Sequence, residues 1–150
     1  MLGLKLRPEF SGKRIKGTVV DFNNKDKTGA LDRDSADFLK ITYPSLDILK
    51  ALEYCQPENA HPIVLQGARG QGKSHLMAVL YHAFKDQEAT QKWLSYWSDK
   101  MDKPKIKDFV PKSDFKIIAE SLHKQRYKFL WELVFEQHPR GEFYKGKWNN

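Results

Sequence analysis

The sequence predicts an α/β fold in which a parallel sheet is flanked by helices. Two short apolar runs, residues 62–66 (PIVLQ) and 115–120 (FKIIAE), have the length and composition of buried strands. A glycine-rich turn follows the first run directly, and an amphipathic segment follows the turn. Strand, turn and helix in this order are typical of a parallel α/β unit.

The part of the chain before the first apolar run predicts one helix and little other regular structure. Residues 1–36 are expected to form a basic arm and a charged, glycine-bearing loop, with residues 25–37 the loop proper. Residues 38–45 are predicted as a short extended piece. Ser45 is the expected N-cap of a helix over residues 46–55, which places Leu46, Leu49 and Leu52 on one side.

Residues 37–150 are expected to form the domain itself. Helical spacing predicts a helix after the glycine turn, with an apolar stripe from Leu76 to Phe84, and a second helix over residues 88–101 with Trp93, Trp97 and Met101 on one side. A lysine-rich loop broken by prolines follows. A last helix is predicted over residues 123–137, after which the tail is expected to be irregular. Its expected apolar face consists of Tyr127, Leu130, Trp131 and Val134.

Composition and charge restrict the classes of protein and partner. The chain has 150 residues, one cysteine and a formal net charge of +7, with its basic residues concentrated in the first twenty positions and the C-terminal half. One cysteine cannot form an internal disulfide, and no run has the length of a signal peptide or membrane span, so we expect a cytoplasmic protein that is not in a membrane. A nucleotide, DNA or a solvated surface could each account for the positive charge.

The turn carries the spacing of a phosphate-binding loop. Gly67 and Gly72 are separated by four residues, and Lys73 and Ser74 follow at once. Glycines allow several backbone N–H groups to point at one phosphate, Lys73 would bridge the outer phosphates, and Ser74 would offer its hydroxyl to Mg²⁺. The predicted ATP-binding residues are Gly67, Ala68, Arg69, Gly70, Gln71, Gly72, Lys73, Ser74 and His75. For Arg69, contact with phosphate, with a neighbouring subunit or with solvent alone remain alternatives.

Hydrolysis of the bound nucleotide needs an acidic residue in addition to the loop, and the sequence offers one candidate. In phosphate-loop enzymes an acidic residue at the end of another apolar strand holds Mg²⁺. Glu120 ends the run 115–120, so it is the candidate catalytic acid beside Lys73. Lys116 interrupts that run, and Ser121 stands where a second acid is expected. A glutamate that faces solvent or caps the next helix is therefore the favoured alternative.

The stretches GARGQGKSHLMAVLYHAF and ESLHKQRYKFLWELVFEQHPRGE resemble the N-terminal part of large ATP-binding proteins from bacterial anti-phage defence islands of the BREX type. The resemblance extends to LKLRPEFSGKRIKGT and FLKITYPSLDILKALE. It implies an AAA+-like P-loop NTPase core, here incomplete, with Gly67, Gly72, Lys73 and Ser74 as the Walker A residues. It also implies DNA methylation or restriction components as partners. The sequence has no identifiable arginine finger, and because such a group often comes from a neighbouring subunit, an oligomer stays open.

Other candidate sites are weaker, and three functions remain in view. His75 and His82 lack the spacing and companions of a zinc site. Arg126 and Lys128 lie in HKQRYK, which fits a nucleic-acid surface or the solvated rim of a helix.

The preferred function is an ATP- and Mg²⁺-binding module of a larger ATPase, which binds without turnover on its own. The alternative is a DNA-binding or partner-docking module with nucleotide as a structural switch, and a small nucleotide kinase is disfavoured.

Overall fold

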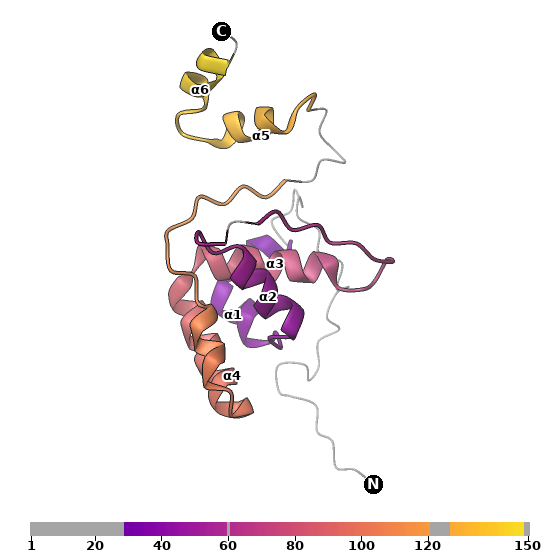
Figure 1. Cartoon of the computed structure of the whole chain (residues 1–150). Helices are drawn as coiled ribbons and strands as arrows, with labels where there is room; N and C mark the ends of the chain where they lie inside the picture. The colour runs from indigo at the N-terminus through magenta and orange to yellow at the C-terminus, as the bar shows by residue number, and fades with distance from the viewer. Residues whose placement is uncertain (1–28, 60, 121–126, 149–150) are drawn as a thin grey trace.

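A computed structural model describes residues 29–59, 61–120 and 127–148 (Figure 1). The predicted basic arm up to residue 28, together with Ser121 and Arg126, lies outside the described residues. In the described part of the chain, no helix has both the length and the apolar character needed to cross a bilayer.

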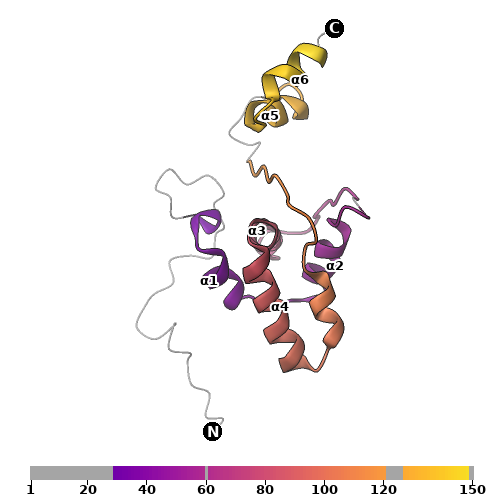
Figure 2. The same cartoon turned by 90° about the vertical axis from the view of Figure 1, so that its left-hand side faces the viewer.

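The described residues form six α-helices and two 3₁₀ helices. A first group comprises η2 (Ala30–Asp32), α1 (Ser35–Lys40), α2 (Leu46–Tyr54), α3 (Lys73–Lys85), α4 (Gln87–Met101) and η3 (Pro104–Phe109). Two further helices follow towards the C-terminus, α5 (Leu130–Gln137) and α6 (Gly141–Trp148), and they pack on each other. Figure 2 shows α1 and α2 on opposite sides of α3.

The predicted α/β fold with a parallel sheet, and with it the P-loop NTPase fold, is wrong, because the described residues contain no β-strand. Residues 62–66 and 115–120 are extended, but neither pairs with a neighbour. The first run borders the beginning of α3, whereas the second follows its later turns at Leu80, Tyr81 and Phe84. A strand needs a hydrogen-bonded partner about 4.8 Å away, and these two runs do not provide one for each other.

The core is instead formed between helices. Fully buried side chains come from each α-helix of the first group: Leu39 from α1, Leu52 from α2, Val79 from α3 and Leu94 from α4. Ala78 and Ala83 are also fully buried on α3. Because alanine is small, the neighbouring helices can approach the axis of α3 closely, so α3 lies at the centre of this core.

Helix α1 occupies a region predicted as loop and extended chain. Asp34 caps it by accepting a hydrogen bond from the backbone N–H of Asp37 at 3.0 Å. Phe38 and Leu39 lie next to each other in sequence and are both buried. Their burial in a helix of only six residues requires neighbours on two sides, which α3 and α4 provide. The N-cap residue Asp34 is a signal for α1 in the sequence, but a segment of six residues is too short to show helical periodicity.

The predicted helices around the glycine turn are confirmed within one to three residues. Helix α2 begins after Ser45, whose hydroxyl accepts from the N–H of Ile48. Its buried face differs from the prediction, because Leu46 is exposed and Ile48 is buried. Leu46 is the first residue of the helix, and in the first turn a side chain can extend beyond the packed face.

The C-terminal region differs from the prediction at both of its helices. Helix α5 begins at Leu130, after residues 127–129 of the predicted helix, because the Glu132 carboxylate accepts hydrogen bonds from the N–H groups of Lys128 and Phe129 and so caps the helix there. Residues 123–126 of that prediction lie outside the described residues. Its expected core face is exposed, with Leu130 65% and Val134 45% accessible. The tail predicted as irregular forms α6 instead and packs on α5.

A buried histidine joins α3 to the beginning of the described chain. The His82 side chain is fully buried, with Nδ1 3.0 Å from Ser35 Oγ and Nε2 2.8 Å from the carbonyl oxygen of Ala30. A carbonyl only accepts, so Nε2 carries the proton and, in the neutral ring, Nδ1 accepts from the Ser35 hydroxyl. Phe38 stacks on the ring at 4.5 Å. Burial lowers the pKa of His82 below its ordinary value of 6.5.

We expect the free energy of unfolding to fall as pH is lowered through the histidine range. The unfolded chain takes up a proton at His82 near pH 6.5, whereas the folded chain resists this because its pKa is lower, so acid favours the unfolded state. Neighbouring Arg33 and Lys85 act in the same direction, and Asp34 opposes them. Melting temperatures of wild type and His82→Gln, measured from pH 7.5 down to about pH 5.5, check this.

The quantity to compare is the pH dependence of the melting temperature in wild type and in His82→Gln, because other groups titrate in both proteins. His82→Gln is expected to melt at a lower temperature throughout and with a shallower dependence on pH. His61→Gln is the matched control, since His61 is exposed. Equal pH dependence in wild type and His82→Gln would contradict the assignment of a neutral His82.

Candidate functional site

The glycine turn forms a compact loop between the extended run and α3. Gly70 and Gly72 have φ angles of 85° and 81°, in the left-handed region that residues with a β-carbon adopt at a cost of roughly 1–2 kcal/mol. Gly67 has a φ angle of 154°, and a β-carbon there would meet the end of the Gln71 side chain, which would have to shift. The glycines therefore let the chain reverse within a few residues and enter α3 at Lys73.

The Lys73 side chain folds back over this loop. Its ammonium group donates to the carbonyl oxygens of Gly67 at 2.8 Å and of Ala68 at 2.7 Å. The Gln71 side chain closes the loop from the other side by accepting from the N–H of Ala68 at 2.9 Å. An ammonium has three N–H donors, so Lys73 keeps one for an anion while it holds the loop in shape.

The beginning of α3 presents further donors in the same place. Within the part of the chain that the structure describes, the first hydrogen bond inside the helix runs from Leu76 N–H to Gly72 O, and no side chain caps the preceding N–H groups. These groups carry the positive end of the helix dipole. Ser74 is exposed in this first turn, and its contact with Mg²⁺ stays a prediction.

The side chains of two other predicted residues, Arg69 and His75, have different surroundings from those of Lys73 and Ser74. Arg69 is exposed at the tip of the turn, and the choice among its three alternatives stays open. His75 lies on α3 with its ring 5.5 Å from the ring of Phe38. It therefore packs towards α1.

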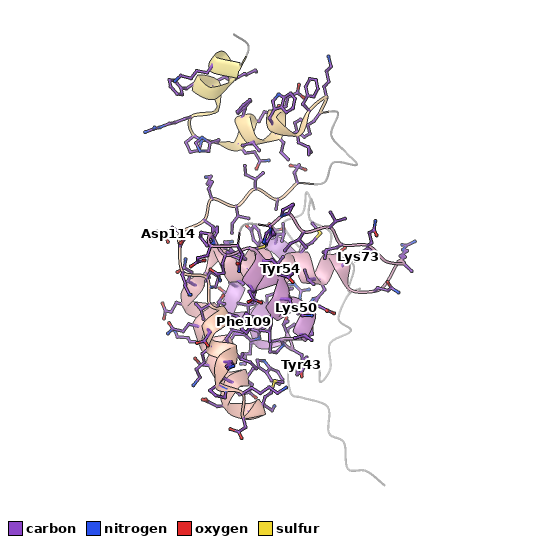
Figure 3. The ribbon with its side chains drawn as sticks, in the orientation of Figure 1. Tyr43, Lys50, Tyr54, Lys73, Phe109 and Asp114 are labelled. Atoms are coloured by element: carbon purple, nitrogen blue, oxygen red, sulfur yellow. The ribbon has the colours of Figure 1, made fainter. Side chains whose placement is uncertain are left out.

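A cavity of about 370 Å³ adjoins the loop, and α2, which was predicted as a helix but not as part of the site, forms its other wall. Asp47, Lys50 and Tyr54 of α2 line it together with Gln71 and Lys73 (Figure 3). The three α2 residues are spaced by three and four positions, so they share one face of the helix. The spacing of these three residues in the sequence is the signal for this polar face, which lies beside the apolar face of the same helix.

The backbone fixes how α2 and the loop are joined. The carbonyl oxygen of Tyr54 accepts from the N–H of His61 at 3.2 Å, so the extended run begins at the end of α2. Residues 63–66 then line the same cavity as α2 until the loop begins. The cavity consequently has the loop at one end and an exposed aromatic ring, Tyr54, on its α2 wall.

Glu120, the predicted catalytic acid, does not share this cavity with Lys73. It borders a separate and largely apolar cavity of about 480 Å³, whose walls include Met77, Tyr81 and Phe115. The acid that does border the loop cavity is Asp47. A catalytic role for Glu120 stays a prediction. No group of three or more histidine, cysteine, aspartate or glutamate side chains gathers as a metal site within the described ranges.

Comparison of the chain with protein-family models, with curated proteins and with solved structures found no match. The resemblance to the ATP-binding proteins of defence islands therefore stays a prediction from the sequence stretches that carry it.

Proposed function

We propose that the loop at residues 67–74 binds the phosphates of a nucleoside triphosphate, with ATP and Mg²⁺ as the natural pair. One observation carries the proposal: the Lys73 ammonium is fixed over a glycine loop by two carbonyl groups, next to the uncapped beginning of α3. Cationic and N–H donors then converge on one exposed place. This local geometry, rather than a sheet behind it, supplies the attraction for phosphate.

The adjoining cavity suits the nucleoside part of the same ligand. Its volume of about 370 Å³ is within the range of small-molecule sites. Tyr54 is 45% exposed and offers a ring face for a base. Lys50 and Lys73 outweigh the single charge of Asp47, so the cavity favours an anionic ligand.

The proposed activity of these residues is binding without hydrolysis. Hydrolysis needs a carboxylate that holds Mg²⁺ and another group that orients the attacking water. Glu120 borders a different cavity from Lys73. This favours nucleotide as a structural switch, in which the bound form of the loop and α2 is read by a DNA or protein partner.

The wider role that we propose is a module of a larger cytoplasmic ATPase in bacterial phage defence. Its support is the sequence resemblance alone. Other defence-system proteins, DNA and further copies of the chain would then be the partners.

ATP with Mg²⁺ is expected to raise the melting temperature of the protein. Ligand at a hundred times its dissociation constant adds about 2.7 kcal/mol to the free energy of unfolding, or roughly 5 to 10 °C for a domain of this size. Lys73→Ala should abolish the shift, because it removes the ammonium that would face the phosphates. Lys85→Ala, at the other end of α3, is the matched control and should keep the shift. Equal shifts in all three proteins would contradict the proposal.

A separate experiment tests whether the nucleoside part of ATP occupies the cavity beside the loop. Tyr54→Ala should weaken ATP about fivefold, because an aromatic contact contributes about 1 kcal/mol, and should leave inorganic triphosphate unchanged. Isothermal titration with both ligands measures this. The exposed Phe143 of α6, outside this cavity, gives the control variant Phe143→Ala. Equal weakening of ATP and triphosphate would show that Tyr54 acts on the loop instead.

Phosphate release at saturating ATP should be no faster for wild type than for Lys73→Ala. The reason is that Asp47 is the one carboxylate among the described residues that line the loop cavity, whereas hydrolysis also needs a group that orients the attacking water. Addition of DNA should not accelerate release. Sustained turnover near one per second in wild type alone would show that an acidic residue completes the site. Glu120→Gln and Asp47→Asn would then identify which one.

A further inference from the structure

Another cavity, of about 510 Å³, lies between α1 and α4. It shares no residue with the loop cavity. Aromatic rings and lysines make up most of its lining: Lys40, Lys92, Trp93, Tyr96, Trp97 and Lys100.

The aromatic rings meet at right angles in this region. The Tyr96 and Trp97 rings are 5.5 Å apart at 82°, and Tyr43 meets Trp97 from another side at 5.0 Å and 86°. Tyr96 is 56% and Tyr43 54% exposed, although aromatic side chains of this size are usually buried. Tyr43 is labelled in Figure 3, away from the loop residue Lys73. The protein thus keeps flat apolar surface accessible here.

Positive charge surrounds the same rings. The Lys100 ammonium lies 5.0 Å from the centre of the Trp97 ring and 5.4 Å from that of Tyr96. Lys92 pairs with Glu88 at 2.5 Å, while Lys40 comes from the last turn of α1. Three lysines line the cavity and no acidic residue does. The cavity therefore attracts a ligand that carries both a flat ring and negative charge.

Trp97 adds a donor that the protein leaves unused. Its indole Nε1 is buried, and no described residue accepts a hydrogen bond from it. A buried donor without an acceptor is unfavourable, so this end of the Trp97 ring lowers the stability of the surrounding packing. The attraction for a ligand therefore depends on the exposed rings and lysines.

We propose that the cavity between α1 and α4 binds a base and the adjoining phosphates of single-stranded nucleic acid. An unpaired base exposes a ring face that can stack on Tyr96, and its flanking phosphates would meet Lys40, Lys92 and Lys100. In a duplex the base faces are already stacked on each other, so the rings could not contact them. The site is independent of nucleotide binding at the loop.

The test is fluorescence anisotropy with a labelled oligothymidylate of about 12 nucleotides and with a duplex of equal length, at low and moderate salt. Tyr96→Ala should weaken single-strand binding about tenfold and leave duplex binding unchanged, while Tyr96→Phe should behave as wild type. Replacing the three lysines by glutamine should reduce the slope of log affinity against log salt by about two.

The control for charge is a second triple variant, Lys105→Gln/Lys112→Gln/Lys116→Gln, which removes three exposed lysines elsewhere. It should weaken binding much less than the variant in the cavity. The proposal is overturned if oligothymidylate does not bind at low salt, if Tyr96→Ala binds it as wild type does, or if the two triple variants are equally weakened. The cavity lysines are exposed, so their replacement keeps the test valid even if Tyr96→Ala is poorly folded.

Discussion

The burial of one side of α3 is the constraint on which the rest of the described helical core depends. Ala78, Val79 and Ala83 have no exposed surface, and α1, α2, α4 and η2 all contact this helix. His82 adds direction to that packing, because its two ring nitrogens must reach Ser35 and Ala30 at once. Apolar packing alone would tolerate rotation of the helix, whereas two hydrogen bonds to one buried ring do not.

The same helix positions the loop, so the stability of the core and the proposed binding of phosphate are connected through α3. Its last turns are fixed by the core, and its first turn projects into solvent with Lys73 folded over the glycines. A rigid helix ending in free donors needs little rearrangement when an anion arrives, which lowers the cost of binding. Helix α2 completes the arrangement, since one side packs in the core while Lys50 and Tyr54 face the loop cavity.

The two cavities proposed as binding sites would attract an anion in different ways. At the loop, backbone N–H groups and one fixed ammonium converge on a point, which suits a compact group such as a phosphate. Between α1 and α4, three lysines surround aromatic rings, which suits an extended ligand with alternating rings and charges. Both rely on side chains that the fold holds at its surface, and neither requires a β-sheet.

The sequence by itself determined the local elements, whereas the tertiary structure decided their partners. The cap at Ser45 and the helical stripe from Leu76 predicted α2 and α3, and the spacing of Gly67, Gly72 and Lys73 predicted a loop that backbone conformation explains. Such signals act within a few residues. Sheet formation at 62–66 and 115–120 requires two distant segments to meet in register, and apolar composition cannot specify that. The side-by-side placement of Lys50, Tyr54 and Lys73 likewise arises only when two helices pack.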